Sequence, residues 1–115
     1  MPSDQLDNYL RMHRRRSAFS QEEVAFLIGA GTAGTVARYE LGRREPSLDT
    51  ALALEALFKA PVAELFAGRF TTVEQSVAER AQELIAKVRA AGVSPSATAK
   101  LQALRAVTQP TPLSL

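Results

Sequence analysis

Three glycines between residues 29 and 34 constrain the fold of this chain more than any other feature. The segment reads GAGTAG, and this spacing fits two different structures. One is a tight turn between two short helices. The other is the G-x-G-x-x-G loop that holds the pyrophosphate of a dinucleotide inside a β-α-β unit, with Asp49 at a plausible distance downstream. The residues on either side of the glycines distinguish the two.

Both flanks favour helices. Ser20 followed by Glu23 is a capping box, which satisfies orphaned amide groups at a helix start, and strands do not begin in this way. Downstream of Glu40 the chain reads LGRREPSLDT, where a dinucleotide-binding unit needs a run of buried aliphatic residues for its second strand. The sequence therefore predicts two helices around a glycine turn, and the nucleotide-binding alternative lacks both of its strands.

Composition limits the classes of function. The 115 residues suffice for one modest core, with 46% hydrophobic residues, and the chain has no cysteine and one histidine. Thiolate metal sites and histidine clusters are excluded, so we expect no metal. We also expect no cofactor and no enzymatic activity. The longest uncharged run, residues 24–37, is too short to span a bilayer, and the first 16 residues do not resemble a secretory signal. We expect a cytoplasmic protein.

Apolar residues recur at helical spacing through the first 68 residues. The pattern predicts five helices, at about 4–16, 21–28, 33–41, 48–58 and 61–68, and no strand. Each helix is expected to bury one face. The predicted buried residues are Leu6, Leu10 and His13 in the first helix, Val24, Ala25 and Ile28 in the second, Val36 and Tyr39 in the third, Leu48, Ala51, Leu52, Ala56 and Leu57 in the fourth, and Val62, Leu65 and Phe66 in the fifth.

The pattern changes after Gly68. A Thr71/Glu74 capping box predicts a longer helix over 71–91, followed by a break at 92–96 and a weaker helix over 97–107. We therefore divide the chain into an all-α domain at 6–68 and a C-terminal helical extension at 69–115. The long helix carries an apolar stripe that we interpret as a dimerisation or partner-binding surface, formed by Val73, Val77, Ala81, Leu84, Ile85 and Val88.

Residues 6–67 resemble the helix-turn-helix domain of the Cro and phage-repressor type, also called the XRE family. The resemblance rests on three motifs in order: SQEEVAFLIG, then ARYELGRREPS, then the LEALFKAPVAELF ending. It implies a five-helix, lambda-repressor-like domain whose third helix enters the major groove of DNA, usually as a dimer. Two departures are visible. The turn is one residue longer around Ala30 and Gly31, and the third helix begins with small side chains.

On this interpretation the DNA-binding residues lie in and around the third helix. Arg38 faces outward and is the candidate for a bidentate contact to guanine, unless it is solvated or pairs with Glu45. Small side chains at the start of the helix permit close approach and contacts to a phosphate or a thymine methyl group, and the following arginines fit backbone phosphates. The resemblance adds a phosphate contact at the start of the second helix. The predicted set is Gln21, Thr32, Ala33, Gly34, Thr35, Arg38, Arg43 and Arg44.

Charge supports this interpretation only locally. Residues 1–68 carry eight Lys and Arg against nine Asp and Glu, but seven of the eight are arginines in two clusters, at 11–16 and 38–44. The resemblance also pairs Arg14 with Glu40 between the first and third helices. It places His13 in the core, where we expect a packed side chain rather than a ligand.

The sequence thus predicts a transcriptional regulator, in particular a repressor that binds double-stranded DNA at a pseudo-palindromic operator as a homodimer. The alternative is an antitoxin that represses its own operon and binds a toxin through residues 69–115. A nucleotide-binding fragment is the third and weakest hypothesis.

Overall fold

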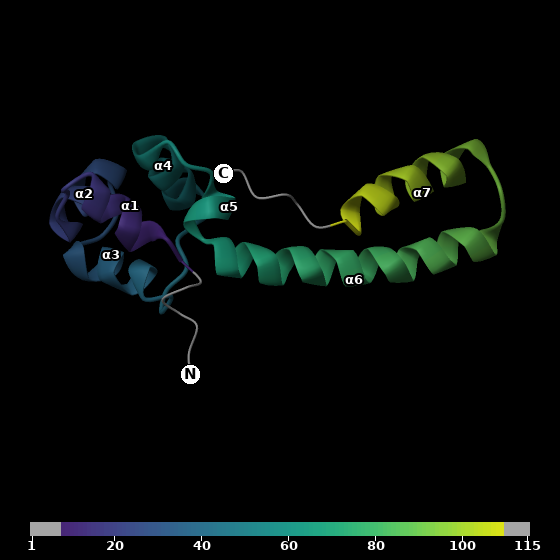
Figure 1. Cartoon of the computed structure of the whole chain (residues 1–115), viewed down its shortest axis with the longest axis horizontal. Helices are drawn as coiled ribbons and strands as arrows, with labels where there is room; N and C mark the ends of the chain where they lie inside the picture. The colour runs from purple at the N-terminus through teal and green to yellow at the C-terminus, as the bar shows by residue number, and fades with distance from the viewer. Residues whose placement is uncertain (1–7, 110–115) are drawn as a thin grey trace. The chain divides into compact units, whose positions relative to one another are not determined.

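A computed structural model describes residues 8–109, and every regular element in that range is a helix. The helices are α1 (Leu10–Arg16), α2 (Gln21–Ile28), α3 (Ala33–Glu40), α4 (Leu48–Phe58), α5 (Val62–Leu65), α6 (Ala67–Ala91) and α7 (Pro95–Val107) (Figure 1). The all-α prediction is confirmed. Residues 8–109 contain no strand, so the β-α-β interpretation of the glycine motif is wrong. Leu6 lies outside the described residues. The first helix begins at Leu10, and Asn8 and Tyr9 are not helical, so the prediction of helix over residues 8 and 9 is wrong.

Local capping fixes the bounds of α2. Ser20 Oγ accepts a hydrogen bond from the Glu23 amide (3.0 Å), and Glu23 Oε1 accepts one from the Ser20 amide (2.8 Å). At the other end, Gly29 adopts the left-handed conformation with φ +66°. Glycine reaches this region without a Cβ penalty, so it ends the helix cheaply. The capping box and both bounds of α2 are as predicted.

The first five helices share one core. Each contributes one fully buried side chain, namely Leu10, Val24, Val36, Leu54 and Leu65 in order. Ala25 and Tyr39 join this cluster, and Phe19, Ile28, Leu57, Phe58 and Phe66 pack around it partly buried. Because no helix buries its apolar face alone, the orientation of α3 depends on contacts with the whole domain.

The buried face of α4 differs from the prediction. Leu48 and Leu52 are 74% and 49% exposed, and Ala56 is also exposed. The buried residues are Thr50, Ala51 and Leu54, with Leu57 and Phe58 partly buried. The leucines of α4 form two overlapping stripes at helical spacing, and the sequence does not distinguish them. In the structure the stripe containing Leu54 faces the core, and Phe58, four residues later, packs against it partly buried.

Three predicted boundaries move. α5 ends at Leu65, and α6 begins at Ala67, so Gly68 does not end a helix and Thr71 lies inside α6 rather than capping it. α7 begins at Pro95 instead of residue 97, and Ser94 Oγ accepts a hydrogen bond from the Ala97 amide (3.0 Å). Proline suits a first helical position because the amide it lacks has no partner there.

The chain divides into two compact units after Phe70. In the second unit, α7 turns back along α6 (Figure 1). Val88 of α6 lines a pocket together with Ala97 and Lys100 of α7. Only part of the predicted α6 stripe is buried: Ala81, Ile85 and Val88 are covered, whereas Val73, Val77 and Leu84 are between 45% and 51% exposed. The second unit therefore retains an uncovered apolar row.

The turn between α2 and α3 is closed by a contact between Gly31 and Thr35. Gly31 has φ +71°, and a Cβ there would overlap the Thr35 side chain. Thr35 Oγ1 in turn accepts a hydrogen bond from the Thr32 amide (3.3 Å), which ties the first turn of α3 to its start. The chain therefore needs glycine at residue 31 for both its backbone conformation and its space.

We predict that Gly31→Ala destabilises the protein by at least about 1 kcal/mol more than Gly29→Ala. Both changes force alanine into a left-handed conformation, but a Cβ at Gly29 has open space around it. Urea denaturation of the two variants measures the difference. Equal losses would show that Gly31 is needed for its φ angle alone.

Candidate nucleic-acid interface

α3 is anchored by one face and exposes the other. Val36 and Tyr39 are buried on its inner side, where α3 packs on α2, and Arg38 is exposed on its outer side. This is the arrangement that the sequence predicted for these three residues. The helix thus presents one long basic side chain from a fixed backbone.

Arg38 has no competing partner. Its side chain forms no hydrogen bond or ion pair with residues 8–109. Glu45, which the sequence offered as an alternative partner, instead pairs with Arg69. Arg43 and Arg44 follow α3 and are exposed, and Gly42 with φ +72° begins the loop that carries them. Three arginine side chains are therefore available to an external anion.

The predicted small residues at the start of α3 fall into two groups that differ in their exposure. Thr32 and Gly34 are exposed and Ala33 is half-buried, so these positions accept the close approach of another molecule. Thr35 is only 7% exposed and packs against Gly31. The structure therefore gives Thr35 a role inside the fold, in positioning the start of α3, rather than a place on the predicted contact surface.

Gln21 also has a structural partner. Its Nε2 donates a hydrogen bond to Glu40 Oε1 (3.1 Å), and the residue is half-buried at the start of α2. The predicted phosphate contact would have to use the remaining amide hydrogen or the backbone of the helix N-terminus.

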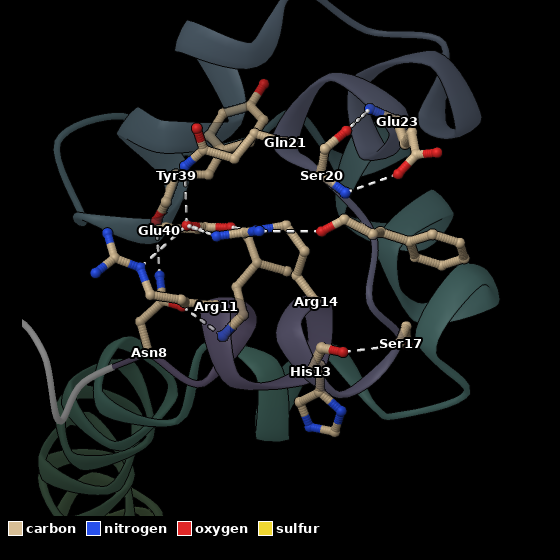
Figure 2. A network of polar contacts seen from close by, with 12 residues as sticks. Asn8, Arg11, His13, Arg14, Ser17, Ser20, Gln21, Glu23, Tyr39 and Glu40 are labelled. Atoms are coloured by element: carbon tan, nitrogen blue, oxygen red, sulfur yellow. Dashed lines mark hydrogen bonds and ion pairs between the residues drawn. The ribbon is translucent and has the colours of Figure 1, made fainter.

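Glu40 is the centre of a polar network that joins three helices (Figure 2). Its side chain is fully buried, at 0% exposure. From α1, the guanidinium of Arg14 donates from Nε to Oε2 and from Nη2 to Oε1 (3.2 Å), and Arg11 Nε donates to Oε1 (3.2 Å). With Gln21 of α2, these donors fix the last residue of α3. The pairing of Arg14 with Glu40 expected from the resemblance is confirmed.

Two further contacts extend this network along the chain. Arg14 Nη1 donates to the Phe19 carbonyl (3.0 Å), which holds the segment before α2. Asn8 Nδ2 donates to the Tyr39 carbonyl (2.7 Å), and Asn8 Oδ1 accepts from the Leu10 amide (2.8 Å) at the start of α1. The C-terminal end of α3 is therefore held from both ends of α1.

The network holds Glu40 in its charged form. Burial alone would raise the pKa of this carboxyl group, but the hydrogen bonds from Arg14, Gln21 and Arg11 outweigh it, and the pKa lies below its usual value. A charged carboxylate is thus stable in the interior because each of its oxygens accepts from a donor that is itself fixed.

Sequence reasoning missed part of this arrangement. Arg11 and Arg14 lie three residues apart, on one face of a helix, and this spacing could have indicated that both reach one carboxylate. Nothing in the sequence pattern indicated that Asn8 or Gln21 takes part in the Glu40 network.

His13 is mostly buried, as expected. Its Nε2 lies 3.2 Å from Glu64 Oε2, and its ring lies against the Phe58 ring with the two centroids 6.0 Å apart.

We predict that Glu40→Gln lowers the free energy of unfolding by about 3 kcal/mol at neutral pH, because two arginines lose their buried counterion. The matched control is Glu45→Gln, which removes a pair exposed on both sides and should cost less than about 1 kcal/mol. Urea denaturation compares the two. Similar small losses would mean that the Glu40 network does not stabilise the fold.

The lowered pKa of Glu40 also gives the stability a predicted pH dependence. The unfolded chain binds the proton more tightly than the folded protein, so the contribution of Glu40 is complete above the ordinary pKa of about 4.3 and is lost as the pH falls through the lower folded-state pKa. The gap in stability between the wild type and Glu40→Gln should therefore narrow below about pH 4.3. A gap that widens on acidification would contradict the assigned direction.

Residues 8–109 contain no cluster of three or more histidine, cysteine or acidic residues that could hold a metal ion. In the same range, no helix combines the length and hydropathy that crossing a bilayer requires. The candidate site is the basic face around α3, which is formed by the exposed Arg38, Arg43 and Arg44.

Comparison with known proteins identifies the first unit. No curated protein and no solved structure gives a significant match to the chain. Residues 10–65 match a family model described as Helix-turn-helix, and this range covers α1 to α5 and the basic face around α3. Residues 10–65 are therefore a DNA-binding helix-turn-helix domain of the Cro and phage-repressor (XRE) type.

Proposed function

We propose that this protein is a transcriptional repressor that binds a pseudo-palindromic operator as a homodimer, with α3 in the major groove. The observation that carries the proposal is Arg38, an exposed side chain without a partner among residues 8–109, on a helix whose other face is buried. DNA is the natural ligand of the family, which is typically not enzymatic. We propose that it binds DNA in the cytoplasm.

Recognition would divide between two kinds of contact. Arg38 would donate two hydrogen bonds to the O6 and N7 atoms of guanine, and the exposed Thr32, Ala33 and Gly34 surface would approach bases or phosphates closely. Arg43 and Arg44 would bind backbone phosphates. Because only one long side chain reads bases, sequence-dependent DNA shape would supply part of the specificity.

Gln21 and Thr35 would serve the same site in different ways. Gln21 keeps its proposed phosphate contact at the N-terminus of α2 and also supports Glu40. Thr35 would act by holding the first turn of α3 against Gly31, rather than by touching DNA. The proposed contact surface is thus narrower than the sequence pattern alone suggested.

The exposed row Val73, Val77 and Leu84 supports dimerisation. A two-fold protein fits a two-fold operator, with half-sites about 34 Å apart, and the second unit offers an uncovered apolar surface for the contact. The same row would also suit an antitoxin, which would bind a toxin there. Affinity capture with the full chain separates them: a stoichiometric foreign partner on α6 favours the antitoxin, and recovery of the chain alone favours the repressor.

We predict different effects from two arginine changes. Arg38→Ala should weaken binding to the preferred DNA by about 1 to 3 kcal/mol and relax the preference at one base pair. Arg43→Ala should weaken binding to all sequences and flatten the salt dependence by about one charge. Binding titrations at several salt concentrations measure both, with Arg105→Ala on α7 as the control. If neither change alters binding, the assigned surface is wrong.

The most informative experiment is selection of bound duplexes from a random pool. The proposal predicts enrichment of an inverted repeat whose halves lie about one helical turn apart. Recovery of a single unpaired half-site would contradict the homodimer, and no enrichment would contradict specific recognition.

A further inference from the structure

The surface of α1 carries a hollow rich in arginine, which we call the α1 hollow. It is lined by Asn8, Tyr9, Arg11, Met12, Arg15 and Arg16. Half of these residues carry a guanidinium group, and none carries a carboxylate. The side chains of Arg15 and Arg16 are exposed and form no hydrogen bond or ion pair with residues 8–109. The Glu40 network therefore leaves part of the positive charge of α1 without a partner in that range.

Arg11 is held in place by one of its nitrogens and exposes the others. Its Nε donates to Glu40 Oε1 (3.2 Å), while the side chain remains 41% exposed. Figure 2 shows the two terminal nitrogens of Arg11 pointing away from Glu40. Within residues 8–109 these two nitrogens have no acceptor. A guanidinium group that the fold already fixes loses little freedom when it binds an anion, so Arg11 is prepared for a phosphate.

Glu40 does not neutralise this surface. Arg11 and Arg14 both donate to its one carboxylate, so the network keeps one positive charge in excess. Glu64, the other carboxylate paired with α1 in the described part of the chain, lies 3.2 Å from the histidine of that helix. In the sequence, residues 1–16 hold four arginines against two aspartates, a net charge of +2. The start of the chain is therefore basic in the segment that forms the α1 hollow.

The α1 hollow adjoins the end of α3 after which the phosphate-binding arginines follow. Helix α1 packs on α3, and Arg11 contacts Glu40, the last residue of α3. Asn8, which also lines the hollow, donates to the Tyr39 carbonyl (2.7 Å). Arg43 follows only three residues after Glu40. The α1 hollow thus continues the basic face around α3.

We propose that Arg11 and Arg15 bind a phosphate of the DNA backbone, beside the phosphates assigned to Arg43 and Arg44. Arg11 and Arg15 are four residues apart and line the same hollow, so both guanidinium groups can reach one phosphate. This inference rests on the proposed function, because it extends the same contact with DNA. The added contact carries no sequence information and strengthens binding most at low salt.

A purely structural role is the alternative for both arginines. Arg15 lies in the last turn of α1, where a positive side chain stabilises the end of a helix, and Arg11 supports Glu40. Such a role changes the free energy of unfolding, but it does not change the number of phosphates that the folded protein neutralises. The salt dependence of DNA binding therefore separates the two roles.

Binding titrations of the full chain with a duplex of mixed sequence, at several salt concentrations, test the inference. Each neutralised phosphate contributes about 0.9 to the slope of log K against log salt concentration. The double variant Arg11→Gln/Arg15→Gln should flatten the slope by about 0.9 and weaken binding several-fold at low salt. Arg15→Gln alone should flatten it by less and leave urea denaturation nearly unchanged. The matched control is Arg105→Gln, which removes an exposed charge of α7 and should leave the slope as it is.

An unchanged slope in Arg15→Gln and in the double variant, together with a flatter slope in Arg43→Ala, would overturn this inference and leave the proposed function intact. Equal flattening in the Arg105→Gln control would also overturn it, because the effect would then follow net charge rather than the α1 hollow. If the wild type binds no duplex DNA at any salt concentration, the proposed function fails, and this inference fails with it.

Discussion

The buried carboxylate of Glu40 is the contact on which the candidate interface depends. It ends α3, and it receives hydrogen bonds from α1 and from the start of α2, so the three helices meet at one charged group. An isolated charge in the interior would be unstable, and this one persists because its donors surround it. A helix held in this way at its last turn, and by Thr35 and Gly31 at its first, presents its exposed side with little freedom.

The buried and the exposed residues of α3 therefore have different roles. Val36 and Tyr39 belong to the core, whereas Arg38 has no role among the described residues that would explain its position. An exposed arginine is unremarkable in itself. Its place on a rigid helix, the two further arginines soon after it and the helix-turn-helix match over residues 10–65 support the proposal that it contacts DNA.

Local signals made most of the first unit predictable. The capping box and Gly29 set both ends of α2, because the interactions that fix these ends involve residues only a few positions apart.

Predictions failed where packing between residues distant in the sequence determines the structure. The α4 leucines gave two equivalent stripes, and only the three-dimensional core selects the one containing Leu54. Gly68 looked like a helix end, but it lies in the first turn of α6, which begins at Ala67. The Glu40 network needed the tertiary fold because its donors are 19 to 29 residues away in sequence.

Chemical-shift mapping of the labelled protein during titration with duplex DNA tests the central claim most directly. The amide signals of residues 32–44 are predicted to move progressively with added DNA, while those of α7 stay in place. Shifts confined to α6 and α7, or the absence of any change around Arg38, would contradict the assignment of α3 as the helix that reads DNA.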